Sequence, residues 1–301
     1  MKRLQKYTGF AVALFVAAFV FVPVTNAQTV PKFVSLGDSF SSGNGADIVP
    51  GQAVGNTSVY DPATNNATNQ CLRSSKSYAP LLATEKGYAL TQVACSGATT
   101  DNILSVGQFN EAPQISAVTP DTQLVTLTIG GNDVGFVPLV ACVVTTSCTT
   151  SSPEIVNTYA QLNTLPQKIT NVLNAIKANA PNAQIRIAGY PQIVPTTNSN
   201  AVGCQPWLAK SEQTLANTIE QQLNGILQTA ATQAGSTVKY IDPFASTSPF
   251  MQRDLVGLTR DACSLSAARA INGIRADFMP ANFHPNILGH RAYQQLFSAS
   301  I

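Results

Sequence analysis

The stretch KFVSLGDSFSSG, residues 32–43, decides the fold of this chain. Its first part, Lys32–Leu36, is an apolar run typical of a buried strand, and the glycine, aspartate and serine that follow are typical of a turn. Similar runs recur along the chain, several of them nearly continuous in hydrophobic residues: Thr91–Ala94, Gln123–Ile129, Gln184–Ala188 and Thr237–Ile241. Such runs are expected for strands that are buried on both faces of a sheet.

Helical stretches separate these strands, at about Tyr78–Lys86, Glu154–Asn179 and Leu208–Gln233, and a last helix starts near Pro285 and runs towards Phe297. Alternating strands and helices predict an α/β fold: a three-layer α/β/α sandwich around a five-stranded parallel sheet. No repeat or linker divides the chain, so we expect one domain over residues 28–301. The stretch Asn44–Asn69 is rich in Asn, Thr and Gly and predicts a long surface insertion.

The N-terminus has the build of a signal peptide. A basic segment, MKRLQKYTGF, precedes a continuous apolar run, and the small residues of VTNAQT follow. We expect cleavage after Ala27, so that residues 1–27 are removed and the mature protein is secreted. The alternative is a retained membrane anchor, but the apolar stretch Phe10–Val24 falls short of the ~20 residues that a transmembrane helix needs.

Composition excludes some partners. Hydrophobic residues make up 45% of the chain and charged residues only 11%, so the chain can bury a sizeable core. The formal charge is +2, but Lys2, Arg3 and Lys6 belong to the predicted signal peptide. Without these three, 14 of the 17 basic residues remain against 15 acidic residues, which gives a net charge of about −1. No basic stripe remains for nucleic acid and no polybasic cluster for anionic lipid. We expect a monomer without a nucleic-acid partner.

The six cysteines fit an exported protein. Even numbers of cysteines in such chains usually form disulfides. A zinc site is disfavoured because there is no CxxC pair and the chain has only two histidines, so we expect no metal and no cofactor. The residues leave many pairings open, of which sequential pairing is the simplest, because Cys142 and Cys148 are close enough to close only a small loop.

Four segments that follow the strands carry chemically useful residues. They are Leu36–Gly43, Ala94–Thr100 (ACSGATT), Ile129–Asp133 (IGGND) and Phe283–Asn286 (FHPN). Ligands of open parallel sheets bind beyond the carboxyl ends of the strands, so these segments should converge at one edge of the sheet.

Their chemistry is complementary. A serine hydroxyl becomes a good nucleophile when a histidine takes its proton, which suits Ser39 and His284. The oxyanion that forms on an ester carbonyl needs preorganised donors, which the Ser39 N–H, the Gly97 N–H and the Asn132 side chain can supply.

Taken singly, each residue has a plainer interpretation. Ser39 can cap a helix, Gly97 and Gly130-Gly131 can serve turns, Asn132 can form an Asx turn, and His284 can simply precede a helix that starts at Pro285. A packing or surface role is favoured for His290 inside that helix. The joint occurrence in strand order favours catalysis over four unrelated turns.

This set resembles the SGNH (GDSL) hydrolases. GDSF, Gly97 within ACSGATT, GGND and HPN look like the four blocks of that family, and the resemblance runs from about Val34 to His290. It implies a flavodoxin-like fold, Ser39 as nucleophile and His284 as base. CLRSSKSY, LTIGGNDVGF, GYPQIVP and FHPNILGH look like secreted bacterial lipases and esterases with three disulfides. That likeness implies the pairs Cys71–Cys95, Cys142–Cys148 and Cys204–Cys263.

One departure concerns the partner of His284. Many members of the family have an aspartate three residues before the histidine, where this chain has Ala281. We expect the main-chain oxygen of Ala281 to accept a hydrogen bond from Nδ1, which gives a Ser39–His284 dyad. Asp277 and Asp242 are the competing acceptors, although both fit ordinary surface or capping roles better.

The sequence thus predicts a secreted serine ester hydrolase acting on small-molecule or lipid esters. The same residues would also serve a phospholipase, a carbohydrate acetylesterase or an acyltransferase; the rival from another class is an inactive binding module. There is no GxSxG elbow, no HExxH motif and no P-loop. We expect the walls of the acyl pocket to come from the Asn44–Asn69 insertion and from a loop over Phe136–Cys148.

Overall fold

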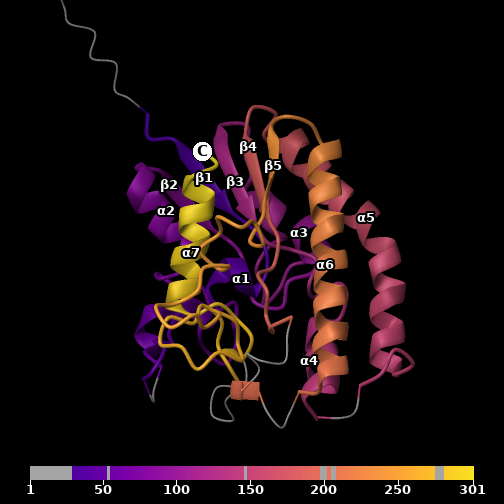
Figure 1. The fold of residues 1–301 in the computed structure, drawn as a ribbon. Helices are drawn as coiled ribbons and strands as arrows, with labels where there is room; N and C mark the ends of the chain where they lie inside the picture. Colours follow the sequence, from indigo (N-terminus) through magenta and orange to yellow (C-terminus); the bar gives the residue numbers. More distant parts are fainter. Residues whose placement is uncertain (1–28, 53–54, 146–147, 197–201, 205–207, 275–280) are drawn as a thin grey trace, which may run out of the picture.

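A computed structural model describes residues 29–52, 55–145, 148–196, 202–204, 208–274 and 281–301. Five parallel strands form one sheet in the order β2-β1-β3-β4-β5, which confirms the predicted fold class (Figure 1). The strands are β1 (Lys32–Ser35), β2 (Ala89–Gln92), β3 (Thr122–Leu127), β4 (Gln184–Ala188) and β5 (Val238–Ile241). Because all five run in one direction, their carboxyl ends lie at a single edge of the sheet.

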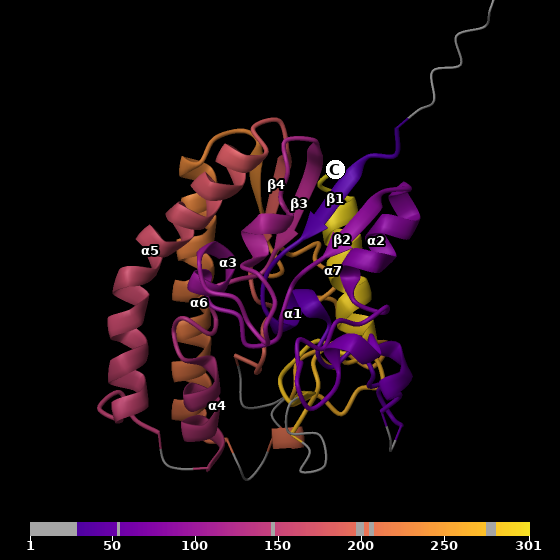
Figure 2. The same ribbon diagram turned by 180° about the vertical axis from the view of Figure 1, so that it is seen from behind.

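Helices cover both faces of the sheet. On one face α2 (Tyr78–Lys86) packs beside α7 (Ile287–Ser298), and on the other α5 (Pro153–Asn179) lies beside α6 (Lys210–Gln233), as both views show (Figure 1 and Figure 2). The short α3 (Thr100–Leu104) and α4 (Phe136–Thr145) pack against α5. The one-turn α1 (Ser39–Ser42) directly follows β1. Single turns of 3₁₀ helix cover Thr57–Val59, Pro62–Thr64, Gln114–Ala117 and Val202–Cys204.

The central strands are buried for the reason that their sequences predict. In β3 five of six residues are buried, and in β4 four of five, because helices cover both faces. β2 lies at the edge of the sheet and alternates between exposed and half-buried residues. The expected strand Thr91–Ala94 is therefore shifted: residues 93–95 lie beyond the end of β2, where the N–H groups of Val93 and Ala94 both donate to the oxygen of Ser35.

Of two expectations about segments between the strands, one is wrong and the other holds only in part, since most described residues of 51–69 are exposed. Most of the predicted loop Phe136–Cys148 is the helix α4. Its Pro138 is tolerated because it lies in the first turn, where the backbone N–H that proline lacks would have no acceptor within the helix. The predicted surface insertion Asn44–Asn69 begins in the interior, where Asn44 and Asp47 are buried. The Tyr60 hydroxyl holds this part by donating to Asp47 and accepting from the Gly45 N–H at 2.9 Å.

Three disulfides join Cys71 to Cys95, Cys142 to Cys148 and Cys204 to Cys263. This is the pairing that the family resemblance implies. The Cys71–Cys95 bridge joins the turn after β2 to the long segment that precedes α2, and Cys204–Cys263 closes a loop of 59 residues. Within the described ranges, no helix is both long and apolar enough to cross a bilayer. The signal-peptide prediction falls on residues 1–27, which lie outside the described residues.

Candidate active site

Ser39 and His284 meet directly although 245 residues separate them. The Ser39 Oγ lies 2.8 Å from the His284 Nε2, a hydrogen bond in which the imidazole can accept the hydroxyl proton. Ser39 is the first residue of α1, which Asp38 caps by accepting the Phe40 N–H at 3.0 Å. His284 lies in the turn before α7, which begins at Ile287, two residues later than the expected start, with Asn286 as its cap.

The second ring nitrogen of His284 faces a main-chain oxygen, as expected, but the residue differs. Nδ1 lies 2.9 Å from the carbonyl oxygen of Asn282. The expectation of Ala281 is wrong: its oxygen instead accepts the His284 backbone N–H at 3.2 Å, which closes a tight turn. Phe283 takes the left-handed conformation in this turn, with φ of 62°. The turn leaves the Asn282 oxygen opposite the ring, and this acceptor selects the tautomer with hydrogen on Nδ1.

Aromatic rings surround the imidazole. The Phe40 ring centroid lies 5.2 Å from that of His284, and the Phe136 ring meets it edge-on at 6.1 Å. Burial lowers the pKa of His284 to about 4, although the hydrogen bond with Asn282 opposes this shift. The imidazole is therefore neutral at neutral pH, which is the state that a general base requires.

Asp38 ties the nucleophile turn to the neighbouring strands. Its carboxyl group accepts from the Thr128 hydroxyl at 2.7 Å and from the Tyr190 hydroxyl, besides the Phe40 N–H. The Tyr190 oxygen in turn accepts the Gly131 N–H at 2.9 Å. Burial raises the pKa of Asp38 to about 6, while these donors hold it down. One carboxyl group thus links the ends of β1, β3 and β4.

Of the three expected oxyanion donors, Ser39 lies in this turn, and Gly97 and Asn132 lie in segments joined to it. The Cys95 N–H donates to Gly37 at 2.9 Å, and the Asp38 N–H donates to Thr128 at 3.0 Å. Asn132 Nδ2 donates to the carbonyl oxygen of Ala98, the residue after Gly97, at 2.9 Å. This bond fixes the side-chain amide and leaves its second N–H hydrogen for another acceptor.

The main-chain donors are free. Among the described residues, neither the Ser39 N–H nor the Gly97 N–H has an acceptor. Gly97 has φ of 82°, a conformation that glycine adopts without strain. Gly97 is exposed and Ser39 is buried, so the Ser39 N–H in particular lacks the partner that buried N–H groups usually have; both donors can bind an anionic oxygen.

Asp133, the last residue of the GGND block, has a structural part in the site. Its carboxylate accepts from the Thr100 N–H at 2.9 Å and from the Thr100 hydroxyl at 2.6 Å, and Lys168 lies 3.3 Å away. These bonds attach the start of α3 to the turn after β3. They hold the segments that carry Gly97 and Asn132 against each other.

The competing acceptors and the second histidine take other roles. Asp242 accepts the N–H of Phe244, two residues ahead, as in an Asx turn. Asp277 lies outside the described residues. His290 is fully buried in α7, which fits the expected packing role. No three His, Cys, Asp or Glu side chains in the described ranges are grouped so that they could hold a metal ion.

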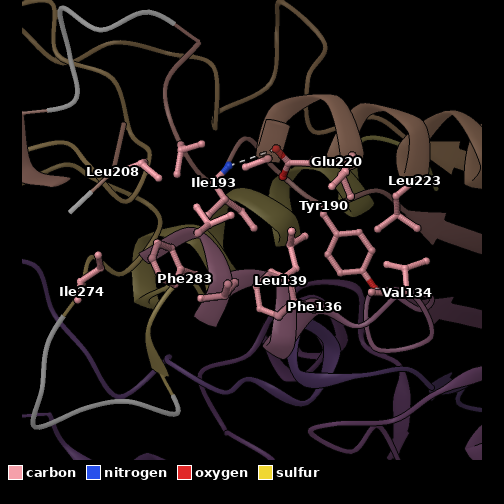
Figure 3. A pocket seen from close by; sticks show the side chains of 16 residues that line it. Val134, Phe136, Leu139, Tyr190, Ile193, Leu208, Glu220, Leu223, Ile274 and Phe283 are labelled. Carbon is pink, nitrogen blue, oxygen red and sulfur yellow. Dashed lines mark hydrogen bonds between the residues drawn. The ribbon is translucent and has the colours of Figure 1, made fainter. Parts of the chain in front are cut away.

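An apolar cavity adjoins the pair through Phe136, which lines the cavity and contacts the His284 ring. Phe283 and Phe136 form the wall next to His284, and Gly131 adjoins Asn132. Helices α4 and α6 supply most of the remaining walls (Figure 3). The lining contains residues of the segment Phe136–Cys148, as expected for the acyl pocket, but none of the described residues of Asn44–Asn69.

Sequence reasoning missed several residues of the site. Asn282 gave no signal, because any residue can offer a carbonyl oxygen. Thr128 and Tyr190 follow predicted strands and could have been suspected from their polar groups near the same edge. Together the groups comprise a serine hydroxyl hydrogen-bonded to a neutral imidazole, N–H groups without acceptors and an apolar cavity, a set of groups that suits acyl transfer from an ester.

Comparison with known proteins agrees with this class of enzyme. Residues 35–292 match the model of the GDSL-like Lipase/Acylhydrolase family. The chain is 30% identical over 277 residues to Lipase 2 of Streptomyces coelicolor, covering 88% of this chain and 84% of that protein. It is 33% identical over 241 residues to a lipase of Streptomyces rimosus, covering 77% of this chain and 80% of the relative.

Solved structures agree. The extracellular lipase of Streptomyces rimosus superimposes with a TM-score of 0.70 at 26% identity, covering 90% of this chain and 100% of that one. Phospholipase A1 from Streptomyces albidoflavus gives a TM-score of 0.67, also at 26% identity, and covers 91% and 100%. The chain is thus a hydrolase of ester bonds. It belongs to the GDSL-like lipase/acylhydrolase family.

Proposed function

We propose that this enzyme cleaves lipid esters through an acyl-enzyme intermediate on Ser39. The observation that carries the proposal is the 2.8 Å hydrogen bond between Ser39 Oγ and His284 Nε2, beside Phe136, whose ring contacts His284 and lines the apolar cavity. His284 takes the hydroxyl proton as Oγ bonds to the acyl carbon. It then gives that proton to the leaving alcohol as the ester C–O bond breaks. Water, activated by the same imidazole, releases the acid and restores Ser39.

The oxyanion of each tetrahedral intermediate would be stabilised by three donors. These are the Ser39 N–H, the Gly97 N–H and the Asn132 side chain, and the free state of the two main-chain donors supports this assignment. The Asn282 carbonyl orients His284 in place of an aspartate, so the proposed unit is a dyad with a main-chain third partner.

The cavity favours an extended acyl chain over an acetyl group. Its lining is almost wholly apolar and comes from α4, α6 and the segment after β4. An acetyl group would leave most of this surface unoccupied, which argues against a carbohydrate acetylesterase. Extended acyl chains occur in glycerides and in phospholipids alike, so the alcohol side of the substrate is the part that an assay must decide.

We also propose that the mature enzyme is exported as a single domain. The signal-peptide pattern of residues 1–27, the three disulfides and the printed description of the Streptomyces rimosus relative as extracellular support this.

A chain-length series of p-nitrophenyl esters, run beside a phospholipid and acetylated xylan, tests the proposal. Esters of medium or long acids should be cleaved with a higher kcat/KM than the acetate, and Ser39→Ala should abolish cleavage while its circular dichroism spectrum stays unchanged. Activity confined to acetate esters, or a fully active Ser39→Ala variant, would contradict the proposal.

A further inference from the structure

One carboxyl group lies in the wall of the apolar cavity. Glu220 follows Ile219 in α6, and its side chain lies among the apolar groups that line the cavity (Figure 3). Only 8% of the residue is exposed. The other polar group of the lining, the Tyr190 hydroxyl, is already engaged with Asp38 and Gly131. Glu220 is therefore the available polar group of this wall.

The carboxyl group is poorly satisfied by the protein. One oxygen, Oε2, accepts the Ile193 N–H over a long 3.5 Å, and Oε1 has no hydrogen-bond partner among the described residues. None of the ion pairs between described residues includes Glu220. Burial raises its pKa well above the usual range. This shift favours the neutral acid, which has one O–H donor and spare acceptor capacity.

Packing does not explain a glutamate at this position. The α6 positions around it that face the interior carry apolar Ile219 and Leu223, and also Asn217 and Asn224, whose amides hydrogen-bond main-chain groups at 2.8 Å. Glu220 has only the long bond from Ile193, and a leucine would fill the same space without a desolvated carboxyl group. An unpaired buried polar group destabilises the folded state, so its presence in a ligand cavity suggests that a ligand supplies the missing partner.

The chemistry of the wall specifies that partner. A largely apolar cavity with one polar group matches a hydrocarbon chain with one polar substituent. A neutral carboxyl group both donates and accepts, and a hydroxyl group does the same, so the two can exchange a pair of hydrogen bonds. A cation would require the ionised carboxylate, and an anion would lack a counter-charge among the described lining residues.

We propose that Glu220 is a specificity-determining residue that hydrogen-bonds a hydroxyl group on the acyl chain, so that hydroxylated acyl esters are favoured substrates. The inference rests on the proposed function, because it takes the cavity as the acyl site. The inference adds to the proposed function a class of substrate and a residue that selects it.

The test compares p-nitrophenyl decanoate with its isomers that carry one hydroxyl at successive chain positions. In wild type at least one isomer should be cleaved with a kcat/KM equal to or above that of the plain ester. Glu220→Leu should lower the relative kcat/KM of that isomer about tenfold or more, since it removes a hydrogen-bonding partner. Glu220→Gln should keep the preference, because an amide also donates and accepts. Ile219→Val, a neighbouring change in the same wall, should affect both esters alike.

Binding gives a second readout that does not need turnover. Calorimetry on Ser39→Ala, with and without Glu220→Leu, should show tighter binding of the matching hydroxydecanoic acid than of decanoic acid only when Glu220 is present. Equal ratios for wild type and Glu220→Leu in both assays would overturn the inference while leaving ester hydrolysis intact. Absent hydrolysis with retained Glu220-dependent binding would instead overturn the proposed function alone.

Discussion

The Tyr190 hydroxyl makes two bonds that a single substitution can remove. It donates to Asp38 behind the nucleophile turn and accepts the Gly131 N–H at 2.9 Å, next to Asn132. Tyr190→Phe keeps the ring, which packs edge-on against Phe40 at 5.0 Å, and removes only the oxygen. The substitution therefore tests whether the Asp38 network holds the strand ends together.

The expected loss of stability follows from the hydrogen-bonding groups that Tyr190→Phe leaves unpaired. The buried Gly131 N–H would lose its acceptor, at a cost of about 1–3 kcal/mol, and Asp38 would lose one of three donors, at about 1 kcal/mol or more. We expect Tyr190→Phe to lower the free energy of unfolding by roughly 2–4 kcal/mol, and the melting temperature by about 5–10 °C. A shift of Gly131 also displaces Asn132, so kcat should fall about tenfold or more.

The loss of stability in Tyr190→Phe should depend on pH. The folded-state pKa of Asp38 is already raised to about 6, and losing the Tyr190 donor raises it further, so stability is lost as pH rises through this range. Denaturant unfolding should show a larger deficit at pH 7.5 than at pH 5. Tyr159→Phe serves as the control, since its half-buried hydroxyl has no hydrogen bond among the described residues. An equal, small effect of both substitutions would refute the network.

Three further predictions concern the base and the disulfides. Because burial holds the pKa of His284 at about 4, kcat/KM should stay level from pH 8 to 6 and fall only as pH drops through about 4; an inflection near 6.5 would indicate a solvated imidazole. Since Asn282 already accepts from Nδ1, Asp242→Asn and Asp277→Asn should each keep turnover within about tenfold, whereas a loss near 10⁴-fold would restore a carboxylate triad. Replacing Cys204 and Cys263 by serine opens a loop of 59 residues and should lower the free energy of unfolding by about 4 kcal/mol, measured by denaturant titration; no change would argue against a stabilising bridge.

The strands were predictable because the pattern that specifies them is strong. Continuous apolar runs bounded by Gly, Asp and Asn gave β1, β3, β4 and β5 within two residues of each end. The edge strand β2 was displaced by two residues, because half-exposed residues give no clear boundary. The helix α4 was missed since its sequence, FVPLVACVVT, is apolar on all sides and contains a proline. Periodicity is absent there, so nothing in the pattern separates a buried helix from a loop.

The candidate site divides in the same way. Ser39, Gly97, Asn132 and His284 could be singled out because each type suits its chemistry and each follows a strand. Asn282 could not, since its role depends on a main-chain oxygen exposed by the left-handed turn at Phe283. Glu220 could not either, because a glutamate one residue from the apolar stripe of a helix normally faces solvent.

Covalent labelling tests the central claim most directly. A fluorophosphonate should react with wild type at neutral pH and give one adduct by intact-protein mass spectrometry, and peptide mapping should locate it on Ser39. Ser39→Ala should remain unlabelled, and His284→Ala should react at least about a hundredfold more slowly, since Ser39 then lacks its base. An adduct on another residue, or equal labelling of wild type and Ser39→Ala, would contradict the assignment of Ser39 as nucleophile.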